Sequence, residues 1–247
     1  MEDGPTTRTQ RLAVLIPCYN ERATLELSVN RVIGADLPDG VAREILIVDD
    51  GSTDGSVEIG ERLATERQSV RHLSLGINRG KGAAIREGLK KIDADIVLIH
   101  DADLEYDPND HDRVLAPILD GRADAVIGTR FGGQTHRVLY YWHSLANRLV
   151  SALAGMAADL NLSDIECCTK AFRKDILDRI DINEEGFGVE PELVIKVGRM
   201  RTEDGSRLRV YEVPVSYDGR TYDEGKKIRG RDGVWALLCI ARYGFAG

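Results

Sequence analysis

The chain has 247 residues, of which 43% are hydrophobic and 30% are charged, and its formal net charge is −8. These proportions are ordinary for a soluble globular protein, and the length fits one large α/β domain or two small ones. The negative charge argues against a general nucleic-acid-binding protein, which needs positive charge to neutralise phosphates. We therefore expect no nucleic acid as a partner.

The cysteines and the apolar runs indicate in which cellular compartment the protein is expected. The four cysteines form no Cys-x-x-Cys pair, so we expect no zinc site, and a reducing cytosol is the simplest environment for them. Residues 1–10 are polar and do not resemble a signal peptide. The longest apolar runs, at residues 149–158 and 233–241, are shorter than the roughly 20 residues that span a bilayer. We therefore expect a cytoplasmic protein that does not cross a membrane.

Apolar runs alternate with helical spacing in the first half of the chain. Short apolar runs that end at Pro, Asp or Gly predict strands, and hydrophobic residues three or four apart predict helices. The expected strands cover residues 12–16, 44–48, 70–75, 96–100 and 125–127, and the expected helices cover residues 21–33, 52 or 54 to about 64, and 81–91. This alternation is typical of an α/β fold with a mostly parallel sheet and helices on both faces, in which ligands bind beyond the carboxyl ends of the strands.

The second half has a different pattern. Residues 140–158 and 190–200 have helical spacing, whereas residues 169–172 and 208–215 look like strands. Neither an internal repeat nor a low-complexity linker interrupts the sequence. We therefore expect a flexible tail at residues 1–10 and a single domain at residues 11–247, with one half at residues 11–130 and a C-terminal elaboration at residues 131–247.

An acidic motif follows the fourth expected strand. In an extended segment, side chains two residues apart point to the same side, so Asp101 and Asp103 would converge, with Glu105 nearby. Clustered carboxylates repel one another unless a cation lies between them, and Mg²⁺ or Mn²⁺ readily bridges a carboxylate to substrate phosphates. The alternative is an acidic loop before a helix start at residues 107–110. The position directly after a buried strand favours the metal site.

Three more polar segments fall near the same edge of the expected sheet. Asp49 and Asp50 follow the second strand, where they fit a simple turn or a carboxylate that accepts hydrogen bonds from a nucleobase. Tyr19 and Glu21 follow the first strand, where the tyrosine can stack on a base and the glutamate can accept from a ribose or a base. Lys81 lies between glycines before a helix, where it can approach a nucleotide although the spacing is not that of a Walker motif.

Together, five motifs occur in an order that is specific to one family. They are Pro17-x-Tyr19-Asn20-Glu21, Asp49-Asp50-Gly51-Ser52, Asn78-x-Gly80-Lys81-Gly82, Asp101-x-Asp103 and Gly128-Thr129-Arg130. This set resembles the family 2 glycosyltransferases of GT-A fold, whose architecture is Rossmann-like. Within the family it is most similar to the dolichyl- and polyprenyl-phosphate sugar transferases. The resemblance extends from about residue 12 to residue 243.

The resemblance implies an inverting transfer of a sugar from a nucleoside diphosphate sugar, with UDP or GDP as the nucleotide. The residues that it implies for the donor are Pro17, Tyr19, Glu21, Asp49, Asp50 and Lys81 around the nucleotide, and Asp101, Ala102, Asp103 and Glu105 around Mg²⁺ or Mn²⁺ and the diphosphate. The carboxylates Asp101, Asp103 and Glu105 would be the metal ligands.

The resemblance also assigns basic residues to the acceptor side. Arg130 would meet a phosphate of the donor or the acceptor, and Arg137 and Ser144 lie where relatives contact the acceptor phosphate. Residues 217–227 resemble a lid loop, in which Arg220 and Lys226 would neutralise the departing nucleotide. An exposed basic loop is the alternative.

The acceptor decides whether a catalytic base is needed. An acceptor phosphate is ionised near neutrality and needs none, whereas a hydroxyl acceptor needs an Asp or Glu. Asp164 and Glu166 are the candidates, in a base or a positioning role, while Glu190 has no assigned role. Three interpretations stay open: a polyprenyl-phosphate sugar transferase, a transferase that acts on a hydroxyl, and a nucleotidyltransferase or nucleotide-sugar-binding protein.

Two apolar stripes in the second half bear on partners. They consist of Tyr140, Tyr141, Trp142, Leu145 and Leu149, and of Val234, Trp235, Leu237, Leu238 and Ile240. Aromatic-rich amphipathic helices can rest on a bilayer interface, here the inner face of a membrane, whereas such stripes more often form core or a contact between subunits.

Overall fold

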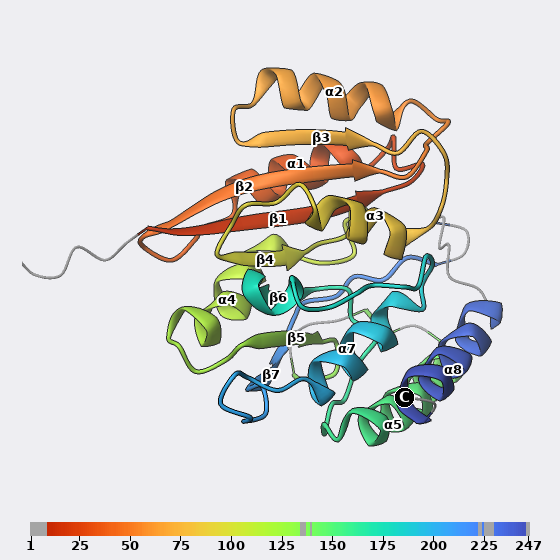
Figure 1. Ribbon diagram of the computed structural model, residues 1–247. Helices are drawn as coiled ribbons and strands as arrows, with labels where there is room; N and C mark the ends of the chain where they lie inside the picture. Colours follow the sequence, from red (N-terminus) through yellow and green to blue (C-terminus); the bar gives the residue numbers. More distant parts are fainter. Residues whose placement is uncertain (1–8, 134–136, 139, 222–223, 225–229, 246–247) are drawn as a thin grey trace, which may run out of the picture.

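The computed structural model describes residues 9–133, 137–138, 140–221, 224 and 230–245. Within these ranges, seven strands form one sheet in the order β3-β2-β1-β4-β6-β5-β7 (Figure 1). The strands are β1 (Gln10–Cys18), β2 (Val41–Asp49), β3 (Val70–Ser74), β4 (Ile96–Ile99), β5 (Ala125–Thr129), β6 (Lys170–Arg173) and β7 (Val210–Pro214). The tail expected at residues 1–10 lies outside the described residues up to residue 8, and Gln10 already belongs to β1.

The sheet is mostly parallel, as predicted. Strands β1, β2, β3 and β4 run parallel to one another, and β5 runs parallel to β7. Strand β6 is antiparallel to both β4 and β5, so it starts where they end. The pairing of Ile99 with Lys170 therefore places the start of β6 at the carboxyl edge of the parallel strands.

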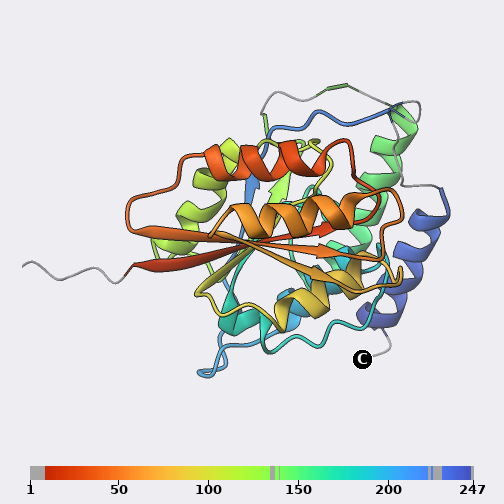
Figure 2. The same ribbon diagram turned by 90° about the horizontal axis from the view of Figure 1, so that it is seen from above.

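Helices cover both faces of the sheet (Figures 1 and 2). They are α1 (Leu25–Gly34), α2 (Ser56–Glu66), α3 (Lys81–Leu89), α4 (His111–Leu119), α5 (Tyr141–Ala158), α6 (Lys174–Leu177), α7 (Val189–Arg199) and α8 (Gly230–Phe245), with the 3₁₀ turn η1 (Pro108–Asp110) before α4. Helix α1 begins four residues later than predicted, because residues 21–24 form a turn in which the carbonyl oxygen of Glu21 accepts from the N–H groups of Thr24 and Leu25.

Two hydrophobic cores lie on the two sides of the sheet. Leu15, Val48 and Val97 face the core shared with α3, α5, α7 and α8. Their neighbours in sequence, Val14 and Leu98, face the core shared with α1 and α4. Because successive side chains of a strand point to opposite faces, a strand with almost only apolar residues contributes side chains to both cores. Burial on both faces holds the strands in position, and the polar residues lie beyond their carboxyl ends.

Helices α5 and α8 lie side by side at the end of the molecule toward which the arrows of β1 and β2 point (Figure 2). Both carry large exposed apolar side chains, among them Trp142 and Leu149 on α5 and Leu238 on α8. One residue of the predicted stripes differs, since Ile240 is buried in the core. In the part of the chain that the structure describes, no helix is both long and apolar enough to span a bilayer.

We predict opposite effects from two Gly→Ala substitutions in helices. A Cβ on Gly198 of α7 would lie 2.5 Å from the carbonyl oxygen of Ala158, whereas a Cβ on Gly233 of α8 would meet nothing within 4 Å. Gly198→Ala should lower the free energy of unfolding by about 1–3 kcal/mol through overpacking. Gly233→Ala should raise it by up to about 1 kcal/mol, because alanine favours helix. Urea unfolding measures both, and equal effects would contradict the close approach of α7 to α5.

Candidate active site

Polar side chains from the carboxyl ends of several strands line one cavity of about 390 Å³. Such an edge is where ligands bind in open α/β sheets. Among the residues singled out from the sequence, those that line it are Pro17, Tyr19, Glu21, Asp50, Asn78, Gly80, Lys81, Asp101, Ala102, Asp103, Glu105, Arg130, Glu166 and Arg220. Segments more than 200 residues apart in the sequence therefore meet at one place.

The acidic motif after β4 lies at the centre of this wall. Leu104 has a positive φ of 66°, which is uncommon for a branched side chain and marks a tight turn between Asp103 and Glu105. Burial, together with the charges of Asp101 and Glu105, raises the pKa of Asp103 to about 7. The three carboxylates are thus close enough to repel one another, which is the property expected of a cation-binding motif.

A buried run of alternating charges lies behind Asp101. The Lys81 ammonium is 2.8 Å from a carboxylate oxygen of Asp101 and 3.0 Å from one of Glu190. The other oxygen of Glu190 accepts from Lys170, which is fully buried at the start of β6. Burial alone would raise the pKa of Asp101, but the Lys81 charge outweighs it and holds the pKa below its usual value. Asp101 is therefore ionised and held in place.

Arg220 closes the opposite side of the acidic motif. Its guanidinium donates to Asp103 at 2.8 Å and to Glu105 at 3.1 Å, and lies 3.5 Å from Glu21. The Tyr217 hydroxyl donates to the second oxygen of Glu105 at 2.7 Å. The start of the expected lid loop is thus fastened to the acidic motif, and Lys226 lies outside the described residues.

The two aspartates after β2 have different surroundings. Asp49 is buried outside the cavity lining, and one of its oxygens accepts from the N–H of Ser52, as in a turn. Asp50 lines the cavity and accepts from the N–H groups of Arg79 at 2.9 Å and Gly80 at 2.6 Å. Asp50 therefore shapes the loop before α3 while it faces the cavity.

At the glycines of that loop, any larger side chain would clash with neighbouring backbone atoms. A Cβ on Gly80 would lie 2.4 Å from the carbonyl oxygen of Glu185, and one on Gly82 would lie 2.1 Å from the carbonyl oxygen of Glu184. Gly80 also has a φ of 105°, in the region that other residues avoid. The close approach of residues 184–185 to the loop positions Lys81 at the start of α3.

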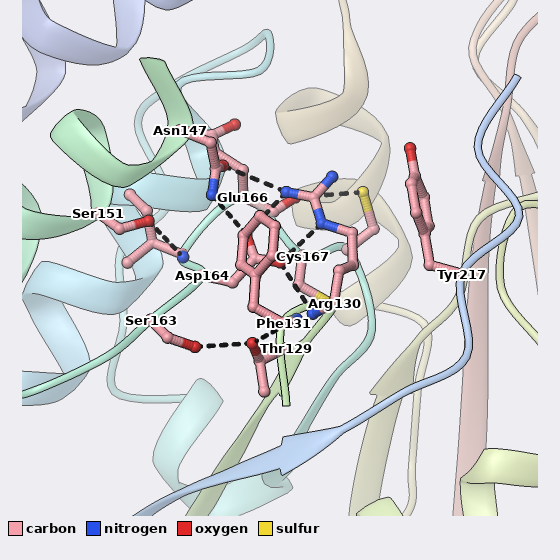
Figure 3. Close-up of polar contacts among 12 residues, drawn as sticks. Thr129, Arg130, Phe131, Asn147, Ser151, Ser163, Asp164, Glu166, Cys167 and Tyr217 are labelled. Atoms are coloured by element: carbon pink, nitrogen blue, oxygen red, sulfur yellow. Dashed lines mark hydrogen bonds and ion pairs between the residues drawn. The ribbon is translucent and has the colours of Figure 1, made fainter. Parts of the chain in front are cut away.

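Arg130, directly after β5, is held by Asp164 (Figure 3). Its Nε and one terminal nitrogen donate to the two oxygens of Asp164 at 2.6 Å and 2.7 Å. The carboxylate also accepts from the Arg130 backbone N–H and from Asn147 of α5. Burial opposes the charge on Asp164, but Arg130 outweighs it and lowers its pKa. Asp164 is fully buried and does not line the cavity, so its position is that of a support for Arg130.

Two residues expected near an acceptor phosphate lie apart from this cavity. Arg137 donates to Glu224 at 2.8 Å and lines a second, more open hollow together with Arg31 and Asp218. Ser144 lies in the first turns of α5, and it lines neither hollow.

Several cavity residues were not assigned a role from the sequence. Cys168, Phe187 and Tyr217 complete the lining together with Glu166, which was a candidate base or positioning residue. A lysine at position 170, inside an apolar strand pattern, is the one sequence signal of the buried charges behind this wall. Its partner Glu190 comes from α7, and only the folded chain brings the two together.

The comparisons with known proteins agree with this architecture. The model of the family described as "Glycosyl transferase family 2" matches residues 13–181. An undecaprenyl-phosphate mannosyltransferase of Micrococcus luteus is 31% identical, over 96% of this chain and 95% of that protein. A dolichol-phosphate mannosyltransferase of Pyrococcus furiosus is 28% identical over 87% of this chain, and this chain spans 59% of that protein.

A solved structure shares the fold. It is glucosyl-3-phosphoglycerate synthase from Mycobacterium tuberculosis in complex with Mn²⁺, UDP and glucosyl-3-phosphoglycerate, with a TM-score of 0.69 over 95% of this chain and 80% of that one. At 22% sequence identity, this likeness concerns the fold alone. It confirms the predicted GT-A α/β architecture, and the matching family model confirms the predicted enzyme class. The chain belongs to glycosyl transferase family 2.

Proposed function

We propose that this enzyme transfers a sugar, with inversion, from a nucleoside diphosphate sugar to a polyprenyl phosphate. The observation that carries the proposal is the single cavity in which the carboxylates of Asp101, Asp103 and Glu105 face the cations of Lys81, Arg130 and Arg220. Carboxylates can hold a metal against a diphosphate, and the cations can stabilise phosphate charge. The relatives from Micrococcus and Pyrococcus, named for transfer to polyprenyl phosphates, support the acceptor.

The acidic motif fits Mg²⁺ or Mn²⁺. Mg²⁺ is usually bound through one or two carboxylates, with substrate phosphates and water completing its oxygen ligands. Among the described residues, no group of three or more Asp, Glu, His or Cys side chains is placed to hold a metal ion. A metal ion bound here would therefore need oxygen ligands from the substrate and water. Burial and the charges of Asp101 and Glu105 raise the pKa of Asp103, and a bound cation would favour its ionised form. Asp101 and Asp103 would hold the ion, which supplies positive charge to the leaving diphosphate.

The nucleoside would occupy the part of the cavity beside β1 and β2. Tyr19 is partly exposed there and can stack on a base, with Pro17 beside it. Asp50 already accepts two backbone N–H groups but retains lone pairs for a base N–H. Glu21 lies at the same wall, within reach of Arg220. The carboxylates that hold the loop before α3 would thus also recognise the nucleotide.

Charge on the departing nucleotide would be neutralised by Lys81 and Arg220. Both cations line the cavity, and the surrounding carboxylates fix their positions before substrate arrives. Preorganised charges of this kind stabilise a transition state without reorganisation during the reaction. Arg220 belongs to the segment that resembles a lid, and its contacts with Asp103 and Glu105 place its charge at the proposed diphosphate position.

An acceptor phosphate would bind near Arg130. Its guanidinium lines the cavity, lies 5.1 Å from the centre of the Tyr217 ring and is oriented by Asp164. A phosphate oxygen is already ionised near neutral pH and attacks the anomeric carbon without a base. Asp164 then has a positioning role, which agrees with its four hydrogen bonds to Arg130 and Asn147.

The lipid part of such an acceptor would reach the site from a membrane. The exposed apolar side chains of α5 and α8 include Tyr141, Trp142 and Trp235, and aromatic residues favour the bilayer interface. Asn147 on α5 contacts Arg130, so this surface adjoins the proposed phosphate position. We therefore propose peripheral contact with a membrane through α5 and α8, in place of a contact between subunits.

A hydroxyl acceptor is the second candidate function, and one observation favours it. Glu166 lines the cavity, and burial and the nearby Glu190 charge raise its pKa to about 7, a value suited to a general base near neutral pH. Nucleotidyl transfer is a third candidate and would release pyrophosphate in place of a nucleoside diphosphate.

A ligand screen tests the donor and the acceptor together. With Mn²⁺ present, one UDP- or GDP-sugar at 100 times its Kd should stabilise the protein by about 2.7 kcal/mol, which is a rise in Tm of roughly 5–11 °C. Turnover should release the nucleoside diphosphate and label a polyprenyl phosphate but not the matching polyprenol. If no sugar nucleotide shifts the Tm, the proposed class of donor is wrong. Labelling of the polyprenol would favour a hydroxyl acceptor.

Removal of the acidic motif should abolish transfer. The double variant Asp101→Ala/Asp103→Ala is expected to lose at least about 1,000-fold in kcat/KM, or roughly 4 kcal/mol of transition-state stabilisation. A chelator should inactivate the unmodified enzyme, and Mn²⁺ should restore it. Asp112→Ala, an exposed aspartate on α4, serves as the control and should leave the rate unchanged. Full activity in the double variant or under chelation would refute the metal site.

Two Asp→Asn variants compare a buried ion pair with an exposed one. Asp164→Asn leaves the buried Arg130 without its counter-charge and should cost about 3–5 kcal/mol of unfolding free energy. Asp159→Asn breaks an exposed pair with Arg207 and should cost at most about 1 kcal/mol. Urea unfolding measures both. A stable Asp164→Asn enzyme that binds the donor but no longer turns over would instead identify Asp164 as a base.

A further inference from the structure

Glu166 is a carboxylate in the wall of the cavity. It lies in the segment between α5 and β6 and lines the cavity beside Arg130 and Cys168. One of its carboxylate oxygens is buried and has no hydrogen-bond partner in the described part of the chain. Figure 3 places Glu166 in the same cluster as Asp164 and Arg130, whose own groups are mutually bonded.

The cations around Glu166 are all paired with other carboxylates. Arg130 is bound by both oxygens of Asp164, and Lys170 is bound by Glu190. Lys81 lies between Asp101 and Glu190. Among the residues that the structure describes, no ion pair of its own therefore compensates the charge of Glu166.

Such an arrangement is costly in the free protein. Burying a polar group without a hydrogen bond destabilises the fold, and here burial and the nearby charge of Glu190 disfavour the ionised form. Groups kept in an unfavourable environment beside an active site are commonly those that a ligand satisfies. A hydroxyl group is the natural partner, because it donates one hydrogen bond without adding charge.

The order of strands along the sheet edge indicates which part of a donor Glu166 would meet. Tyr19 and Asp50 follow β1 and β2, Asp101 and Asp103 follow β4, and Glu166 precedes β6 on the far side of β4. A nucleoside diphosphate sugar has its parts in the same linear order: base, diphosphate, sugar. If the nucleoside lies beside β1 and β2 and the diphosphate lies at the end of β4, the sugar lies beside the start of β6.

The remaining wall on that side suits a sugar. Phe187, which precedes α7, lines the cavity and offers an apolar ring, and Cys168 adds a further weakly polar surface. Sugars combine apolar C–H faces with hydroxyl edges, and sites for such ligands pair a mostly apolar wall with a few placed polar groups.

We propose that Glu166 accepts a hydrogen bond from a hydroxyl group of the donor's sugar and so contributes to the choice of sugar. The inference rests on the proposed function, because it needs a nucleoside diphosphate sugar in this cavity. It does not require Glu166 to remove a proton during the reaction, since a phosphate acceptor is already ionised.

The experiment compares binding of a sugar nucleotide with binding of the nucleotide alone. The probes are the UDP- or GDP-sugar that gives the largest thermal shift with Mn²⁺, and the matching UDP or GDP. Calorimetric titration of Glu166→Ala should show about ten- to hundredfold weaker binding of the sugar nucleotide, the size of a hydrogen bond to a charged group. Binding of the nucleoside diphosphate should be unchanged or tighter. Glu58→Ala, an exposed glutamate on α2, is the matched control and should alter neither.

A second variant separates a ligand-binding role from a structural one. Glu166→Gln keeps the size of the side chain but removes the uncompensated charge, so the ligand-free variant should melt at or above the temperature of the unmodified enzyme. A clearly lower Tm would mean that the carboxylate stabilises the fold, and the inference would fail.

The remaining outcomes are also decisive. If the unmodified enzyme binds the sugar nucleotide and Glu166→Ala binds it equally well, Glu166 does not contact the sugar. If Glu166→Gln binds the donor normally but has lost turnover, Glu166 is a base and the inference is overturned. If no sugar nucleotide binds the unmodified enzyme, the proposed function itself fails, and this inference with it.

Discussion

Four elements of the carboxyl edge are joined by one buried run of alternating charges, from Lys170 of β6 through Glu190 of α7 and Lys81 of α3 to Asp101 after β4. Each member would be costly to bury alone, because an uncompensated charge in a protein interior costs several kcal/mol. Together they compensate one another, and each fixes the position of the next. The orientation of the first aspartate of the acidic motif thus depends on residues from three other elements.

Buried ion pairs of this kind are weak evidence for stability, because the loss of hydration roughly offsets the attraction. In this site the buried ion pairs fix the positions of the charged side chains. Two other cations are also held in position by polar partners. Arg130 is hydrogen-bonded to Asp164 and Asn147, and Arg220 is hydrogen-bonded to Asp103 of the acidic motif. The cavity wall therefore presents fixed charges of both signs, a preorganisation that suits the proposed sugar transfer.

The antiparallel strand β6 has a specific consequence for this site. Because it starts at the edge where its neighbours end, the segment before it, with Asp164, Glu166 and Cys168, lies beside the acidic motif. A parallel strand in this place would put its preceding segment at the opposite end of the sheet. The antiparallel insertion thus brings residues of the second half of the chain to the carboxyl edge built by the first half. The helices with the exposed apolar faces, α5 and α8, border the same region.

The sequence by itself determined the parallel half of the fold and the polar motifs at its carboxyl edge. Apolar strands with polar ends have a clear pattern, and residues such as Asp101, Asp103 and Asp50 lie within a few positions of the strands that place them. The tertiary structure alone decided which partner each charged residue has. That Asp164 supports Arg130 and that Glu190 links two lysines follow from contacts 20 or more residues apart. That one oxygen of Glu166 is left without a hydrogen bond in the described part of the chain likewise depends on the folded arrangement. The spacing of residues along the sequence does not predict such contacts, because they form only when the helices pack on both faces of the sheet.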